Sequence, residues 1–201
     1  MTRDAAGVRS TLSDGGDVRA SLLIGAEGRN SPTRETAGLN VARWTYDHVA
    51  LVTSIGHEHS HENIAYEIFY PEGPFAILPL NDDERGHRSA IVWSVRGSQG
   101  PGMQKLGERG YMAELERKMG GFLGSITWLG PRVAHPLGFH HAATITAQRL
   151  ALVGDAAHGI HPIAGQGVNV GFRDVAALVE VLVDGKRIGL DPGDPALLKR
   201  S

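Results

Sequence analysis

The chain has 201 residues, of which 41% are hydrophobic and 21% charged, so it holds enough apolar material for a folded core. Its net charge of −2 does not suggest a nucleic-acid partner, which would need a basic face, and the absence of cysteine excludes disulfides, thiolate metal sites and cysteine nucleophiles. No signal-peptide pattern is visible at the N-terminus, and every apolar run is shorter than the roughly 18 residues that span a bilayer.

The first part of the chain predicts a hairpin followed by a short helix. Expected strands over 8–12 and 18–24 flank a Gly-rich turn. The second strand ends in Leu22–Ile24, an apolar run typical of a strand that is buried on both faces. Ser31-Pro32 then supplies an N-cap and a first-turn proline, which predicts a helix to about Ala37.

Residues 44–95 change to strand-like segments separated by polar or Gly/Pro breaks, a pattern that predicts an antiparallel sheet. The expected strands are 49–55, 64–70, 75–80 and 89–95. Next come an expected loop over 98–107, a helix over 108–119 and another strand over about 126–137.

The last part of the chain returns to α/β character. Leu150–Val153 reads as a second short buried strand, followed by a Gly-rich loop and a helix over about 166–183. Asp184-Gly185 is expected to end this helix, and 191–195 resembles a linker. Apolar residues at spacings of four and three share one helix face: Val168, Phe172, Val175, Val179 and Leu182.

Two short strands of the parallel type therefore lie at opposite ends of the chain, with an antiparallel sheet between them. We expect a mixed α/β fold in which a partial doubly wound domain carries an inserted antiparallel-sheet domain. Residues 1–42 and 147–201 should form the first domain, and residues 43–146 the second.

The Gly-rich loop has the features of a ligand site. Asp155 lies at the carboxyl end of a buried strand, where α/β folds place ligands, and its carboxylate can accept hydrogen bonds from sugar-type hydroxyls. Gly165 and Gly167 at a helix start allow an anionic group to approach backbone N–H groups. A bare Gly-x-Gly is more often only a tight packing turn, and the spacing to Gly171 misses the dinucleotide fingerprint by one residue.

A wider pattern is more specific. The run Gly154-Asp155-Ala156-Ala157-His158, with Pro162, Gly165-Gln166-Gly167-x-Asn169, Gly171 and Asp174, resembles the second flavin motif of the para-hydroxybenzoate hydroxylase superfamily. Its second half looks most like the ubiquinone-biosynthesis hydroxylase branch. Gly25-Ala26-Glu27-Gly28-x-x-Ser31-x-x-Arg34 resembles the family motif that contacts both flavin and nicotinamide cofactor, with Glu27 in place of the usual Asp.

The resemblance implies an FAD-dependent monooxygenase that hydroxylates an aromatic ring, here a polyprenylated phenol, with NAD(P)H and O2. Such chemistry belongs to the cofactor, so no metal is expected and the catalytic residues stay undefined, with His161 and Pro162 as the nearest candidates. Arg34 is expected to anchor the first motif by ion pairing. The residues implied to bind the cofactor are Gly25, Glu27, Gly28, Arg34, Gly154, Asp155, Pro162, Gly165, Gln166, Gly167, Val168 and Asn169.

Within the implied site, Asp155 would bind the ribityl or diphosphate region, and the loop over 162–167 would lie along the isoalloxazine ring. The helix start at 167–169 would stabilise negative charge on the reduced flavin. A lipid-tailed substrate implies peripheral contact with a membrane or membership of a biosynthetic complex, and we expect a cytoplasmic protein.

Members of the family begin with a βαβ unit carrying Gly-x-Gly-x-x-Gly, which this sequence lacks, so we expect a fragment of a longer enzyme. One alternative is an inert remnant in which the faces of Leu22–Ile24 and Leu150–Val153 are uncovered. Another is a related flavin oxidoreductase with a different substrate. A third is a His-rich metal module at His57-Glu58-His59-Ser60-His61, for which a solvated loop is the more ordinary interpretation.

Overall fold

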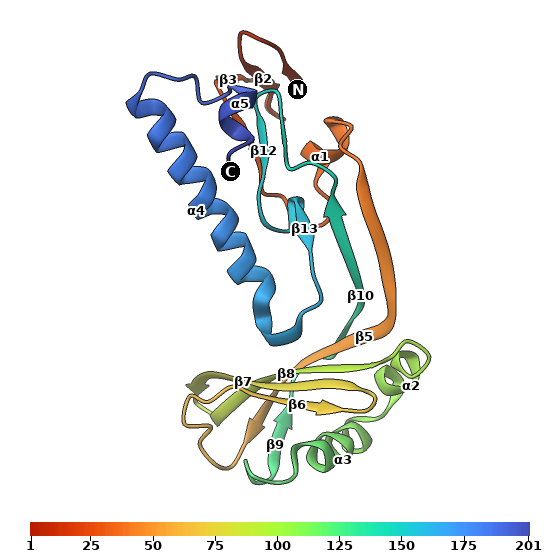
Figure 1. The fold of residues 1–201 in the computed structure, drawn as a ribbon. Helices are drawn as coiled ribbons and strands as arrows, with labels where there is room; N and C mark the ends of the chain where they lie inside the picture. The colour runs from red at the N-terminus through yellow and green to blue at the C-terminus, as the bar shows by residue number, and fades with distance from the viewer. The chain divides into compact units, whose positions relative to one another are not determined.

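The chain forms two compact units, each described here by itself (Figure 1). The computed structural model describes residues 1–201 apart from the side chain of Ala164. The first unit combines Met1–Trp44 with Gly138–Ser201, and the second is Thr45–Leu137. The second unit is thus inserted between the two halves of the first, with boundaries after residues 44 and 137 where the sequence suggested 42 and 146.

The first unit begins with a small antiparallel sheet in the order β1-β2-β3. Its strands are β1 (Thr2–Arg3), β2 (Val8–Thr11) and β3 (Asp17–Ala20). The predicted hairpin is therefore confirmed. Its second strand stops at Ala20, however, and the chain resumes extended structure only at β4 (Leu23–Gly25), which belongs to a different sheet.

That second sheet joins the two ends of the chain. Strand β4 pairs in parallel with β12 (Leu150–Leu152), with Leu23 opposite Leu150 and Gly25 opposite Leu152. On its other edge β12 pairs with β11 (Thr146–Ala147), so β12 has neighbours on both sides and its three side chains are buried. The expectation that Leu150–Val153 is uncovered is wrong, whereas β4 has one paired edge and Ile24 is 47% exposed.

Helix α4 (Gln166–Arg187) packs beside this sheet and runs past the predicted end at Asp184-Gly185. Gly185 lies inside the helix and is buried, and a Cβ there would come 2.6 Å from Cδ2 of Leu197. The small residue therefore lets α5 (Pro195–Leu198) pack closely against α4.

The C-terminal segment is docked onto the first unit and does not behave as the predicted linker. Asp194 caps α5 by accepting hydrogen bonds from the backbone N–H groups of Ala196 (2.6 Å) and Leu197 (3.3 Å). Upstream of it, Asp191 pairs with Arg149 at 2.6 Å. The two leucines of α5 are buried, so local capping and apolar burial together hold the segment in place.

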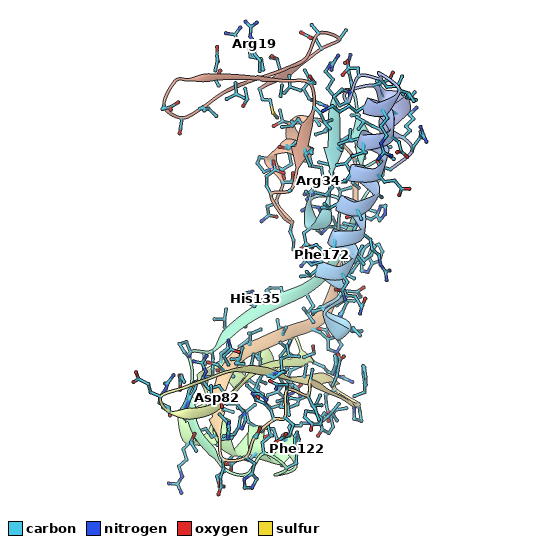
Figure 2. The ribbon with its side chains drawn as sticks, turned by 90° about the vertical axis from the view of Figure 1, so that its left-hand side faces the viewer. Arg19, Arg34, Asp82, Phe122, His135 and Phe172 are labelled. Atoms are coloured by element: carbon cyan, nitrogen blue, oxygen red, sulfur yellow. The ribbon has the colours of Figure 1, made fainter. Side chains whose placement is uncertain are left out.

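The predicted apolar face of α4 is largely uncovered. Leu178 and Val181 are the buried apolar residues of the helix, and Leu182 packs partly against the cluster that contains Leu178. The other four residues of the predicted face are exposed, namely Val168, Phe172, Val175 and Val179 (Phe172 in Figure 2). No helix in the described part of the chain combines the length and apolar character needed to cross a membrane.

The second unit contains the predicted antiparallel sheet, in the order β5-β8-β7-β6, with β9 also paired to β5. Its elements are β5 (Val41–His57, which begins in the first unit), β6 (Tyr66–Tyr70), β7 (Gly73–Asp83), β8 (Gly86–Arg96), α2 (Gly100–Lys105), α3 (Glu108–Met119) and β9 (Ile126–Leu129). A helix, α2, replaces the loop expected over 98–107. The strand expected over 126–137 is divided into β9 and β10 (Val133–Ala142), which leads back into the first unit.

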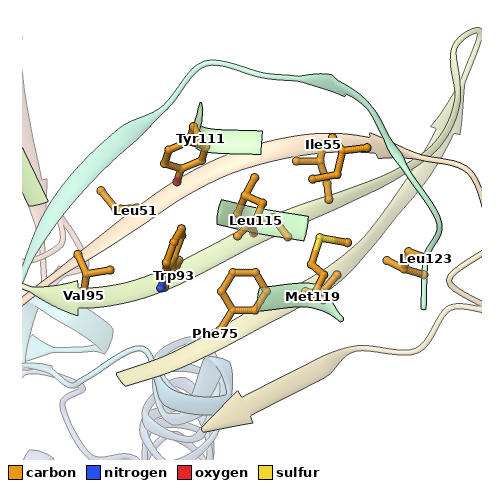
Figure 3. Packing of buried hydrophobic residues seen from close by; sticks show 12 residues of the cluster. Leu51, Ile55, Phe75, Trp93, Val95, Tyr111, Leu115, Met119 and Leu123 are labelled. Carbon is orange, nitrogen blue, oxygen red and sulfur yellow. The ribbon is translucent and has the colours of Figure 1, made fainter. Parts of the chain in front are cut away.

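The core of the second unit lies between its sheet and α3 (Figure 3). Tyr111, Leu115 and Met119 follow one another at intervals of four residues, so they share the helix face that is buried. They pack with sheet residues such as Phe75 and Trp93, whose ring centroids are 5.7 Å apart. The helix ends at Gly120 in the left-handed conformation, at the predicted glycine pair.

Two of the histidines expected in a solvated loop are buried in the second unit. Nδ1 of His57 lies 2.8 Å from the carbonyl of His59, and Nε2 lies 2.9 Å from Oγ of Ser89. The rings of His57, His61 and His87 lie within 5.7–6.5 Å of one another. In the described part of the chain, no group of three His, Cys, Asp or Glu side chains is arranged to hold a metal ion.

The pKa of His57 should make stability depend on pH. Burial lowers this pKa below the ordinary value of 6.5, the His59 carbonyl raises it, and nearby His61 and His87 lower it further. The unfolded chain therefore takes up a proton near pH 6.5 that the folded chain binds only at lower pH, so stability falls as the pH drops below about 6.5. His57→Asn, whose amide can still donate to the His59 carbonyl, should make this fall shallower in urea unfolding at pH 7.5, 6.5 and 5.5. The control His59→Asn removes an exposed imidazole, and an equal change in that variant would contradict the assignment.

The exposed apolar face of α4 should promote self-association. Replacing Phe172 with Lys should lower both the binding of a dye specific for exposed apolar surface and the self-association measured by sedimentation. The free energy of unfolding should change by less than about 0.5 kcal/mol because the side chain is at the surface. Phe69→Lys in β6 is the matched control, since Phe69 and Phe172 are each 68% exposed. An equal loss of association in both variants would show that α4 has no special part in it.

Candidate functional site

The two sequence motifs meet at one edge of the parallel strand pair. Since β4 and β12 run in the same direction side by side, the segments that follow them, 25–34 and 154–158, leave the sheet at the same edge. The backbone N–H of Val153 donates to the carbonyl of Gly25 at 3.0 Å and fixes this junction. Ligands of open α/β sheets bind at the carboxyl ends of the strands, which is where both motifs lie.

Glu27 of the first motif is bound to the start of α1 (Pro32–Thr36). Its carboxylate accepts hydrogen bonds from Oγ of Ser31 (2.8 Å), the backbone N–H of Thr33 (3.2 Å) and Oγ1 of Thr33. Burial raises the pKa of Glu27, but these donors outweigh it and leave the pKa below its usual value. Glu27 therefore stays ionised and holds the motif to the positive end of a helix.

Arg34 joins the two motifs through backbone carbonyl groups. The side chain is fully buried, its Nη1 donates to the carbonyl of Ala156 at 2.7 Å, and its Nη2 donates to the carbonyl of Arg29 at 2.6 Å (Figure 2). Among the described residues no carboxylate lies within ion-pair distance of Arg34, so the predicted ion pair is wrong. The two Nη groups of the guanidinium donate to two different segments, and Ala156 in one of them is 122 residues from Arg34 in sequence.

The second motif is packed tightly against α4. Gly154 has a φ of +59° and its N–H donates to Oδ2 of Asp174 at 2.8 Å. The same carboxylate oxygen lies 2.9 Å from Nε2 of His158. A Cβ on Gly171 would come 3.3 Å from Cα of Gly154, so glycine at both positions allows the helix to approach the turn η1 (Gly154–Ala156).

Asp155 has a fixed backbone and an accessible side chain. Its carbonyl accepts a hydrogen bond from Nε2 of His140 at 2.7 Å, and the next carbonyl, of Ala156, is held by Arg34. Its carboxylate is 45% exposed, and the nearest cation, Nε of Arg29, is 3.8 Å away, beyond hydrogen-bond distance. The carboxylate oxygens can therefore accept hydrogen bonds from a ligand.

The start of α4 is open to an anionic group. Gly165 precedes the helix with a φ of +61°, and no described side chain caps the first turn. A Cβ added to Gly165 or Gly167 would meet nothing within 4 Å, so these glycines leave space beside the backbone and do not serve packing. The positive end of a helix of 22 residues favours negative charge at this place.

Two contributing residues, Arg29 and His140, were not singled out from the sequence, and the contact of His158 with Asp174 was not predicted. Asp174 and His158 lie inside the second motif, but they are 16 residues apart, and nothing in the sequence indicates that their side chains are in contact. His140 reaches the site because β10 pairs with β13 (His158–Gly159), with His140 opposite Gly159. No local sequence pattern indicates that these two strands pair.

Comparison with known proteins agrees with this geometry. A family described as the FAD binding domain matches residues 1–187, and the chain belongs to this family. It is 50% identical over 198 residues to the ubiquinone hydroxylase UbiL of Rhodospirillum rubrum, covering 98% of this chain and 45% of that protein. It is 39% identical over 189 residues to the 3-demethoxyubiquinol 3-hydroxylase of Escherichia coli, covering 94% of this chain and 47% of that protein.

The fold also matches a solved structure. The crystal structure of pqsL, a probable FAD-dependent monooxygenase from Pseudomonas aeruginosa, superimposes with a TM-score of 0.76 at 22% identity, covering 98% of this chain and 55% of that one. At this identity the likeness establishes the fold, and the mixed α/β prediction is confirmed. The chain spans about half the length of the curated relatives that it matches.

The residues present fit the flavin side of FAD. FAD carries ribityl hydroxyls and a diphosphate, and the site offers the accessible carboxylate of Asp155 and an uncapped helix start with the open glycines Gly165 and Gly167. Asn169 and Val168 lie in the first turn of α4, and Pro162 immediately precedes η2 (Ile163–Gly165).

Arg34 should be critical for the stability of the first unit. Arg34→Met leaves the carbonyls of Ala156 and Arg29 without their donor in a buried place, which should lower the free energy of unfolding by about 2–4 kcal/mol. The measurement is urea denaturation at neutral pH. Arg43→Met, which removes an exposed arginine of β5, is the control and should change it by less than about 0.5 kcal/mol. A loss below about 1 kcal/mol for Arg34→Met would contradict the bridging role.

Proposed function

We propose that the chain forms the flavin side of an FAD-dependent monooxygenase that uses NAD(P)H and O2 to hydroxylate an aromatic ring. The observation that carries the proposal is the meeting of both motifs at the carboxyl ends of β4 and β12, with an accessible Asp155 on a clamped backbone. The family match and the names of the relatives support the same reaction class.

In this proposal each group has a definite task. Asp155 would accept hydrogen bonds from the ribityl hydroxyls or border the diphosphate. Gly28 would belong to the cofactor-binding loop of the first motif, and Gly25 at the end of β4 would allow the close packing from which that loop starts. The start of α4, from Gln166 to Asn169, would stabilise negative charge on the reduced cofactor. When bound, FAD would supply the activation of O2 after reduction by the nicotinamide cofactor, and the loop that contains His161 and Pro162 would border it. The protein thus binds, orients and shields, and no side-chain nucleophile is needed.

The substrate we propose is a polyprenylated phenol. The relatives named ubiquinone hydroxylase UbiL and 3-demethoxyubiquinol 3-hydroxylase support this class. An electron-rich phenolic ring is a suitable acceptor for oxygen, and its isoprenoid tail favours a lipid surface. Peripheral membrane contact, or membership of a biosynthetic complex, belongs to the same proposal and places the protein at the cytoplasmic side of a membrane.

A second candidate function is a folded unit that binds no cofactor by itself. Two observations favour it: Ile24 is exposed on the unpaired edge of β4, and the apolar face of α4 is uncovered. Both surfaces belong to the unit that carries the motifs. The two candidates differ in one measurable property, the affinity of the chain for FAD.

Titration with FAD tests both candidates. The purified chain should shift the flavin absorbance and quench its fluorescence, and Asp155→Ala should weaken FAD binding by about tenfold or more because hydrogen bonds to a charged group contribute about 1.5–3 kcal/mol. Asp184→Ala at the far end of α4 is the control and should bind as the unaltered chain does. Equal affinity of the chain and Asp155→Ala would contradict the site, and absence of binding by the unaltered chain would favour the second candidate.

A further inference from the structure

We propose that His140 and Arg29 are positioning residues for Asp155: the first fixes the backbone of Asp155 and the second orients its carboxylate toward the cofactor. The inference rests on the proposed flavin site, because its consequence is measured through FAD. Neither residue was given a contact with the cofactor in the proposed function. Both act on Asp155 from outside the second motif, His140 from β10 and Arg29 from the loop after β4.

His140 acts as a neutral hydrogen-bond donor. A carbonyl can only accept, so the 2.7 Å contact with the Asp155 carbonyl requires the proton on Nε2. The ring is buried, and burial lowers the pKa of His140. The hydrogen bond to Asp155 opposes this shift, and the charges of Arg29, Arg34 and Arg43 reinforce it. At neutral pH the imidazole is therefore uncharged. Its single tautomer, with the proton on Nε2, holds the turn through the Asp155 carbonyl.

Gly159 makes the approach of His140 possible. The two residues are cross-strand partners in the β10–β13 pair. A Cβ on Gly159 would come 2.3 Å from Cε1 of His140 and 2.9 Å from Nε of Arg29, distances shorter than any ordinary carbon contact. The absence of a side chain at this one position therefore admits both positioning groups at once.

Arg29 is tethered so that its guanidinium borders Asp155. Its Nη2 donates to the carbonyl of Gly138 at 2.6 Å, and its own carbonyl accepts from Arg34 at 2.6 Å. Nε then lies 3.8 Å from Oδ2 of Asp155. At this distance the guanidinium attracts the carboxylate but forms no hydrogen bond with it. The side chains are 40% and 45% exposed, so the pair adds little to stability, and its value is in orientation.

A purely structural role and a positioning role predict different results. If His140 and Arg29 only stabilise the fold, their loss should affect FAD binding equally whether or not Asp155 is present. If they act through Asp155, their effect on FAD affinity should vanish once the carboxylate has been removed, because there is nothing left to orient. Double-mutant combinations with Asp155→Ala separate the two cases.

The experiment measures FAD dissociation constants by fluorescence for the chain and its variants. His140→Leu and Arg29→Gln should each weaken binding by roughly five- to tenfold, the effect of one lost hydrogen bond or charge contact. His140→Gln, whose amide nitrogen can still donate to the Asp155 carbonyl, should recover most of the affinity. Either change combined with Asp155→Ala should bind no more weakly than Asp155→Ala alone.

Unfolding curves control for loss of structure, and Arg29→Gln alters a half-exposed side chain, so it keeps the test usable if His140→Leu fails to fold. Wild-type affinity in both single variants, additive effects in the double variants, or no rescue by His140→Gln would overturn the inference while leaving the flavin site intact. If the unaltered chain does not bind FAD, the proposed site and this inference fall together.

Discussion

The first unit depends on one buried guanidinium. Arg34 bonds the carbonyl of Ala156 in the second motif and the carbonyl of Arg29 in the first, and so holds together the two segments that leave the parallel pair of β4 and β12. A planar, permanently charged group with several fixed donors suits this task, since it satisfies two buried carbonyls in one geometry. Once Arg34 is in place, the edge formed by β4 and β12 carries both motifs in a constant arrangement.

The glycines of the two motifs divide into two physical kinds. A Cβ on Gly25 would come 2.7 Å from Leu152, and one on Gly171 would come 3.3 Å from Gly154, so these residues permit close packing between elements. Gly165 and Gly167 border open space. The sequence alone does not distinguish the two kinds. Only the glycines that border open space allow a ligand to approach the backbone. The interpretation as a packing turn therefore fails for Gly165-x-Gly167, whereas packing does account for Gly25 and Gly171.

The sequence predicted what local patterns encode. The hairpin, the apolar strands at Leu22–Ile24 and Leu150–Val153, the inserted sheet, the N-cap at Ser31 and the glycine end of α3 follow from alternation, apolar runs and turn residues. The mixed fold and the family followed from the same motifs. Errors arose where a longer-range contact decides the outcome. Gly185 does not end α4 but makes room for Leu197, and the segment after Gly189 is docked through the pair of Asp191 with Arg149.

The same distinction explains the errors at the site. Spacing suggested an ion pair for Arg34, but the partner is set by which backbone groups are buried nearby, and those are carbonyls. His57 was assigned to a solvated loop because its neighbours in sequence are polar, yet it ends a strand whose partner brings Ser89 to its ring.

His140 shows why such residues escape a reading of the sequence. Its role arises only when a strand from the middle of the chain pairs with a two-residue strand inside the motif. A motif records the residues that recur in one segment, whereas the precision of the site depends on donors that arrive from other segments. The backbone carbonyls of Asp155 and Ala156 are each held by such a donor, whereas the carboxylate of Asp155 is 45% exposed and available to a ligand. The geometry thus separates the atoms that build the turn from the atoms that can bind.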